Sequence, residues 1–497
     1  MKFIFYNLND IVESNNIEIK YHNPVFDSKV LDYRENLFEK VDRLTGQYTH
    51  IVKDVNNPKT LHLFYQVPTR QHINTWKDLS LCYAVSNNDG RTFNKPNLKK
   101  FDYHGNFSTN ILLMEGNAMN NFRVFVDSNP KCLPNEKYKA IGGYHTGPDY
   151  HKNCSKCSGI SRDYIEYYET CWPLERPKLL KDNFYHPCKG NGFYIYKSEN
   201  TIDWDIKYIK PILSKFTKCI GIDKGSGPHC DTMPSIFFDT NKNKYVLYIR
   251  ANIKLGCRYV LYSESTNLEK WESPQLIRLK PEFIISDNEH FGENLYYFNV
   301  YQYPNTDKYI AFAPYFKNRI NNSTGSSRTY KDEYTLVLLS DDGINWTRVT
   351  KLFPYRDGKG HMTGPHILSF LESSDKKKFY FFVQKNFLKN NNYLERYSIL
   401  KDRLFSISSN IEGNFKMVNK LNKPITFIII NYKVVGDGYI YIELFDKNNN
   451  MLQTINKSQF HSKDEMSKKF MINTEHINRI CYINFNIKNA NIYSLTY

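Results

Sequence analysis

The chain has 497 residues, of which 15% are aromatic, and it carries a formal net charge of +16. This length allows one large domain together with a smaller one. We expect no membrane span, since no apolar stretch is long enough for one, and synthesis in the cytoplasm, since no signal-peptide core is visible. The basic residues are scattered, which favours a solvated lysine-rich surface over a nucleic-acid partner.

Residues 1–45 are predicted to be a segment that leads into the first repeat. After it, short strands rich in aromatic and β-branched residues alternate with polar turns. The clearest unit spans residues 230–278, where turn residues separate strands expected at 234–238, 244–250, 258–263 and 270–273. This four-stranded unit serves as the template for the rest of the chain.

A turn signature follows the third strand of each unit: a serine and, six or seven residues later, a large aromatic residue. It occurs at residues 86–93, 198–204, 265–271 and 340–346, with a degenerate copy at 398–405. The serine hydroxyl can bind the turn backbone, and the aromatic ring can cover the sheet. Five units of four strands predict a five-bladed β-propeller over residues 46–409.

The edges of these units are predicted from the same pattern. The outer strand of blade one is expected at 91–98, and that of blade five at 403–407. After residue 410 the signature stops, and alternating strands with hairpin turns continue to residue 497. The predicted fold is therefore all-β, a five-bladed β-propeller followed by a C-terminal β-sandwich.

A cysteine-rich insertion interrupts blade two at about residues 145–191. It contains Cys154, Cys157, Cys171 and Cys188, and the first two form a Cys-x2-Cys pair. This spacing fits a closed tetrahedral zinc site, with disulfides and free thiols as the alternatives. We therefore expect a structural zinc ion and no organic cofactor.

Two of the turn signatures also resemble a known family. Ser-x-x-Leu-x-x-Trp at 265–271 and Ser-x-Asp-Gly-x-x-Trp at 340–346 resemble the blade signatures of five-bladed propeller glycosidases, the group of invertases, levansucrases and arabinanases. Residues 83–98, together with 138–143, 244–250 and 438–446, are similar to an uncharacterised bacterial branch with a C-terminal sandwich. The resemblance implies a carbohydrate partner in an axial pocket and hydrolysis by two carboxylates.

In the resembled glycosidases, acidic residues of the innermost strands meet in the axial pocket. Asp231 and Glu293 stand near the starts of first strands here, which suggests Asp231 as nucleophile or base and Glu293 as general acid. Arg250, His50 and His361 are the expected substrate contacts. The structural alternative is that Asp231 caps a turn and Glu293 is a solvated loop residue.

The chain departs from the invertase pattern, because it lacks the Asn-Asp-Pro-Asn, Arg-Asp-Pro and Glu-Cys elements at the corresponding blades. Fructosidase activity is therefore not expected. Two functions remain: a glycoside hydrolase-like enzyme, or a non-catalytic propeller that binds glycan or protein, for example as a viral surface component packaged in a virion. A pair of inward carboxylates would favour the enzyme, and a pocket of Asn, His and aromatic residues would favour the binding protein. The oligomeric state is not predicted.

Overall fold

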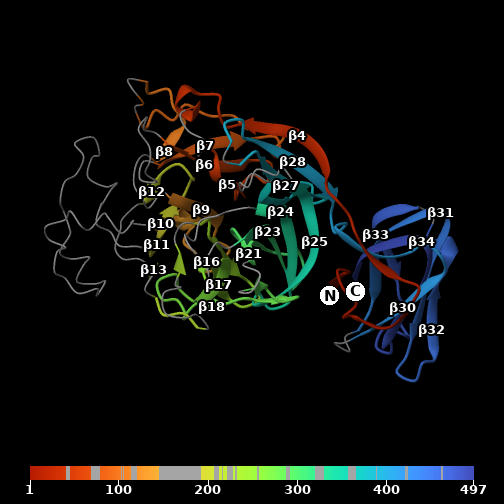
Figure 1. Ribbon diagram of the computed structural model, residues 1–497. Helices are drawn as coiled ribbons and strands as arrows, with labels where there is room; N and C mark the ends of the chain where they lie inside the picture. The colour runs from red at the N-terminus through yellow and green to blue at the C-terminus, as the bar shows by residue number, and fades with distance from the viewer. Residues whose placement is uncertain are drawn as a thin grey trace.

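The structure is a computed structural model that describes residues 1–40, 45–68, 79–101, 103, 106–113, 120–144, 192–205, 212–214, 217–220, 228–229, 232–253, 257–286, 291–319, 330–355, 365–387, 389–419, 424–460 and 463–497. Regular structure in these residues consists of strands and the short 3-10 helices η1 (Leu37–Lys40), η3 (Pro134–Glu136) and η5 (Lys457–Gln459). Five sheets form a propeller and a sixth forms a sandwich beside it (Figure 1). The predicted all-β class is confirmed. Within these ranges, no helix is long and apolar enough to cross a membrane.

Blades one to three each contain antiparallel strands in chain order. Blade one consists of β5 (Gln47–Lys53), β6 (Leu61–Pro68), β7 (Leu79–Ser86) and β8 (Ile111–Leu113). Blade two consists of β9 (Asn120–Val126), β10 (Tyr138–Tyr144), β11 (Gly192–Ser198) and β12 (Trp204–Asp205), with β13 (Leu213–Ser214) also on β11. Blade three consists of β14 (Pro228–His229), β15 (Ser235–Asp239), β16 (Lys244–Asn252), β17 (Arg258–Ser265) and β18 (Gln275–Leu276).

Blades four and five complete the ring. The first strand of blade four is divided into β21 (Phe291–Leu295) and β22 (Asn299–Gln302), and it continues with β23 (Tyr309–Arg319), β24 (Tyr330–Ser340) and β25 (Asn345–Tyr355). The short strands β19 (Arg278–Lys280) and β20 (Ile285–Ser286) pair with β25 and β21. Blade five contains β26 (His366–Glu372), β27 (Lys378–Lys385), β28 (Tyr393–Leu400) and, on its outer edge, β4 (Val25–Asp32).

Three outer strands differ from the sequence-based prediction. In blade one, Asn94 makes only an isolated bridge to Val85, because Pro96 follows and cannot donate to a ladder, and the outer strand is β8. In blade three, Trp271 bridges only Ser265, and the outer strand β18 begins after Pro274. In blade five the strand expected at 403–407 belongs to the sandwich, and the N-terminal β4 takes its place.

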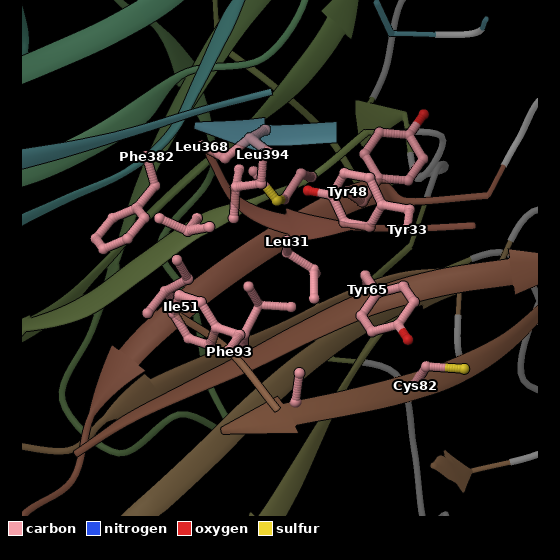
Figure 2. Packing of buried hydrophobic residues seen from close by; sticks show 14 of the residues in the cluster. Leu31, Tyr33, Tyr48, Ile51, Tyr65, Cys82, Phe93, Leu368, Phe382 and Leu394 are labelled. Carbon is pink, nitrogen blue, oxygen red and sulfur yellow. The ribbon is translucent and has the colours of Figure 1, made fainter. Parts of the chain in front are cut away.

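The strand β4 closes the propeller by joining the start of the chain to the last blade. Leu31 is buried, 3% exposed, among apolar side chains of blade one, including Ile51 and Phe93, and of blade five, including Leu394 (Figure 2). A backbone hydrogen bond from the Phe93 amide to the Val30 carbonyl, at 3.2 Å, links β4 to the outer turn of blade one. The first and fifth blades are therefore held together by a segment that precedes both.

This closure gives a first prediction. Leu31→Ala should lower the free energy of unfolding by about 2–4 kcal/mol, because it removes a buried side chain from the contact between the two blades. Val25→Ala in the same strand is the control, since Val25 is 70% exposed, and it should change stability by less than about 0.5 kcal/mol. Guanidinium denaturation followed by circular dichroism measures both. Equal effects would show that β4 does not contribute through packing.

The serine turns have the geometry that the signature predicted. In blade three, the Ser265 hydroxyl accepts a hydrogen bond from the Leu268 amide at 3.0 Å, and the Trp271 indole donates to the Leu268 carbonyl at 3.0 Å. In blade four, the Trp346 indole donates to the Gly343 carbonyl at 2.9 Å. Each ring is thus fixed to its own turn while it lies over the sheet.

The predicted C-terminal β-sandwich is confirmed, and it also takes in the first strands of the chain. Its strands are β1 (Lys2–Ile4), β2 (Ile11–Asn15), β3 (Glu18–Tyr21), β29 (Phe405–Ser409), β30 (Gly413–Val418), β31 (Phe427–Phe445), β32 (Met451–Ile455), β33 (Asp464–Met471) and β34 (Tyr482–Thr496). The strand β34 pairs with β1, β29, β30 and β31. Both ends of the chain lie between the propeller and the sandwich (Figure 1). Residues 1–21, expected to precede the first repeat, are therefore part of the sandwich sheet.

Candidate functional site

The axis of the propeller is closed by polar contacts between first strands. Arg123 of β9 donates to Asn299 of β22 at 3.0 Å, and Asn299 donates to the Ile367 carbonyl of β26 at 2.9 Å. The Ser369 hydroxyl accepts from the Ile51 amide of β5 at 2.9 Å. These bonds tie blades one, two, four and five together, so a ligand would have to approach one end of the axis.

At one end of the axis lies a side-chain cluster that we call the axial mouth and define by Tyr48, Arg250, Arg258, Tyr296 and His366. Tyr48 and His366 stand where first strands begin, Arg250 near the end of a second strand, Arg258 at the start of a third, and Tyr296 between β21 and β22. All of them except Arg258 are buried, with 5% exposure or less. The hydroxyls of Tyr48 and Tyr296 are 3.2 Å apart, and the guanidinium groups of Arg250 and Arg258 lie 5.6 and 5.7 Å from the Tyr296 ring centre. The His366 ring lies 6.3 Å from the same ring. Four blades thus bring aromatic and basic side chains to one place.

Tyr296 reaches this position because the first strand of blade four is interrupted. The register of β21 and β22 against β23 shifts between Leu295, which pairs with Tyr315, and Asn299, which pairs with Phe312. The Tyr296 amide still donates to the Pro314 carbonyl of β23 at 2.9 Å. A ring that would otherwise alternate along the strand is thereby placed under both arginines, where its π face attracts their charge.

His366 is a neutral side chain in this environment. It is 3% exposed, and burial lowers its pKa to about 3. Its Nδ1 has no hydrogen-bond partner among the described residues, and its ring contacts Tyr297 and Phe387 as well as Tyr296. A small cavity of about 10 Å³ lies beside it.

Glu293 lies beyond this cavity, on the face of blade four. Tyr315 donates to its Oε1 at 2.6 Å, Arg348 donates to both oxygens at 3.0 and 2.7 Å, and the Ile284 amide donates to Oε2 at 2.9 Å. Burial alone would raise the pKa of Glu293, but these hydrogen bonds outweigh it and lower the pKa below its ordinary value. The carboxylate is therefore ionised at neutral pH and is the acceptor of a bidentate ion pair.

Glu293 also lines a pocket of about 390 Å³ with Tyr315, Tyr334, Arg348 and Lys351. The stacked rings of Tyr315 and Tyr334, 4.6 Å apart, line both this pocket and the small cavity beside His366. They therefore stand between Glu293 and the axial mouth. The role of general acid for Glu293 stays a prediction, and it would require the carboxylate to leave Arg348 and take up a proton.

The other predicted site residues are placed as follows. Arg250 stands at the mouth and is 4% exposed, and its role as a substrate contact stays a prediction. His50 is fully buried: its Nε2 accepts from the Val124 amide at 2.8 Å, its Nδ1 is 3.3 Å from the Tyr48 carbonyl, and it stacks on Phe64. Burial, followed by the charge of Arg123, lowers the pKa of His50 well below its ordinary value. In this arrangement His50 joins blades one and two and offers no free nitrogen to a sugar.

Asp231, His361 and the four cysteines of the insertion, Cys154, Cys157, Cys171 and Cys188, lie outside the described residues. His229 and Thr232, which flank residues 230–231, do reach the mouth. His229 pairs in the sheet with Arg250, and the Thr232 hydroxyl lies 3.5 Å from the Tyr296 carbonyl. The zinc site stays a prediction, and in the described part of the chain no group of three or more potential metal ligands is brought together.

Sequence reasoning missed Tyr48, Arg258 and Tyr296. The signal for Tyr296 was available, because three consecutive aromatic residues at 296–298 interrupt the alternation expected of a first strand. Tyr48 and Arg258 gave no such signal, since an aromatic or basic residue at a strand start is common.

The sheet order and the turn geometry define the class of protein: a five-bladed β-propeller with a C-terminal β-sandwich. No family model and no curated protein matches the chain. Similar solved structures include an N-acetylgalactosamine deacetylase from F. plautii in complex with blood group B trisaccharide, at 11% identity over 78% of this chain and 96% of that one, with a TM-score of 0.41. A second is a family 43 arabinoxylan arabinofuranohydrolase from Bacillus subtilis, at 9% identity over 92% of this chain and 96% of that one, with a TM-score of 0.37. A third is a family 117 glycoside hydrolase from Zobellia galactanivorans, at 10% identity over 78% of this chain and 90% of that one, with a TM-score of 0.37.

Proposed function

We propose that the protein is a glycoside hydrolase-like propeller that binds a carbohydrate at the axial mouth. The observation that carries this proposal is the convergence of Tyr48, Arg250, Tyr296 and His366 from four blades. Aromatic rings stack on the apolar faces of sugars, and guanidinium groups donate to hydroxyl or carboxylate oxygens. The two arginines further favour a sugar that carries an oxygen-rich or acidic group.

Hydrolysis is the finer proposal, with Asp231 as nucleophile or base. It is supported by the position of its chain neighbours beside Arg250 and Tyr296. A glycosidase also needs a protonated second carboxyl group. The ion pair between Glu293 and Arg348 disfavours Glu293 for that task. This pair is also the observation that favours the second candidate, a propeller that binds glycan without cleaving it.

A panel of neutral and acidic oligosaccharides, tested by calorimetry for binding and by reducing-sugar release for hydrolysis, separates the two. If the protein is an enzyme, Asp231→Asn should lower the hydrolysis rate by a factor of about 10³ or more and leave binding nearly unchanged. Arg250→Gln should weaken binding about tenfold, because it removes the charged donor at Tyr296. Arg278→Gln is the matched control, since Arg278 is exposed on β19.

The outcomes are distinct. Binding that depends on Arg250 without any hydrolysis would establish the non-catalytic function. Equal effects of Arg250→Gln and Arg278→Gln, or no binding to any saccharide, would overturn the axial mouth as the ligand site.

A further inference from the structure

A second pocket lies where the propeller meets the sandwich, and we call it the seam pocket. Its volume is about 500 Å³. The propeller contributes the turns around Lys376 and Lys377 and around Lys401 and Asp402, and the sandwich contributes residues such as Asn431 of β31. The turn with Lys376 and Lys377 joins the end of the first strand of blade five to the second strand, so the seam pocket is at the opposite end of the blades from the axial mouth.

The wall of the seam pocket is basic. Lys2, Lys376, Lys377 and Lys401 all line it. Lys2 is paired with Asp402 at 2.5 Å, and Lys401 is paired with Glu372. Lys376 and Lys377 are exposed and have no carboxylate within ion-pair distance among the described residues. Two ammonium groups at the pocket are therefore available to an anion.

Two further side chains of the wall, Ser494 and Asp402, offer groups suited to hydroxyls. The amide of Asn431 is already bound, since it accepts from Arg403 at 2.9 Å and donates to the Lys401 carbonyl at 2.9 Å. Asp402 is 6% exposed, and its Oδ1 has no hydrogen-bond partner among the described residues. A ligand hydroxyl that donates to this oxygen would satisfy it, since an unpaired buried acceptor is costly.

We propose that the seam pocket is a second ligand site that takes an anionic saccharide, a sugar bearing a carboxylate or sulfate group. Lys376 and Lys377 would bind the anionic group, and the Ser494 hydroxyl and the Asp402 carboxylate would bind the sugar hydroxyls. Its volume is within the range of about 300–1,000 Å³ typical of small-molecule sites. The site is separate from the axial mouth and does not depend on the function proposed there.

The test uses the full chain and calorimetric titration with an oligogalacturonate, with a neutral cello-oligosaccharide of the same length, and with inorganic phosphate. The variant is Lys376→Asn with Lys377→Gln, since residue 376 has φ of 58° and asparagine accepts this conformation. The control is Lys378→Gln, which removes the same kind of charge from the exposed start of β27, outside the pocket wall. We expect the double variant to bind oligogalacturonate about tenfold more weakly and the control to stay within about twofold.

Arg250→Gln is titrated in parallel, and it should retain the lysine-dependent binding because Arg250 belongs to the axial mouth. Loss of binding in Arg250→Gln but not in the double variant would place the anionic saccharide at the mouth and overturn the seam site. Equal weakening by the control, or equal affinity for the neutral oligosaccharide, would also overturn it. Phosphate that binds as tightly as the oligogalacturonate would reduce the seam pocket to a simple anion site and overturn the assignment to a saccharide.

Discussion

Trp346→Ala is expected to lower the free energy of unfolding by about 3–5 kcal/mol, the range for removing a large buried aromatic side chain. Trp346 is fully buried between blades three and four, with its ring 4.9 Å from that of Phe298 and 6.0 Å from that of Tyr248. The substitution removes these contacts and leaves the Gly343 carbonyl without the indole donor. The first loss weakens the contact between blades three and four, and the second weakens the turn of blade four itself.

Trp271→Ala is the matched control for this prediction. Trp271 stands at the same position of the same serine turn in blade three and makes the same indole hydrogen bond, but it is only half-buried. Its replacement should cost about 1–2 kcal/mol. Guanidinium denaturation followed by far-ultraviolet circular dichroism compares the two. If both variants lose the same free energy of unfolding, the turn hydrogen bond, rather than burial of the ring between blades, determines the stability.

Glu293→Gln should destabilise the protein by about 3 kcal/mol at pH 7, because it leaves Arg348 without a charged partner in a nearly buried position. The side chains of Arg348 and Glu293 are 15% and 4% exposed. The folded state lowers the pKa of Glu293, so the ion pair contributes its stability above the unfolded pKa of about 4.3 and loses it as the pH falls through the lower, folded pKa. The difference between the variant and the wild type should therefore shrink below pH 4.

Glu272→Gln provides the comparison, since Glu272 is 61% exposed and pairs with Lys244 at 2.9 Å. It should change stability by less than about 1 kcal/mol. Denaturation curves of all three proteins between pH 3 and pH 7 measure the effect. A Glu293→Gln variant of wild-type stability that loses hydrolysis would restore Glu293 as the general acid, whereas a destabilised variant with unchanged ligand binding supports the structural ion pair.

The repeat could be predicted from the sequence because its signal is local. Ser265 and Trp271 fix one turn by bonds within seven residues, and the copy that contains Trp346 does the same. The closure by β4 could not be predicted, because an alternating strand carries no mark of the partner it will meet hundreds of residues later. The strand 405–409 was misplaced for the same reason.

The site was predicted only in part. Arg250 could be placed because the end of a second strand in a propeller points to one end of the axis. Glu293 was chosen by its position near a first strand, but its environment is set by Arg348 on the distant strand β25 of the same blade. The interruption that brings Tyr296 under the arginines is a feature of backbone geometry, and the run of aromatic residues there was the one local sign of it.

The route of the first 32 residues also sets the order in which the molecule can assemble. During synthesis β4 leaves the ribosome early, yet its partner β28 follows only after the intervening blades, and β1 waits longer still for β34. Until then β4 presents an unpaired edge with the exposed side chains of Val25 and Phe26. Contacts of such long sequence separation form slowly. The ring therefore cannot close before β28 has emerged, nor the sandwich before β34, and the N-terminal strands stay without their sheet partners until then.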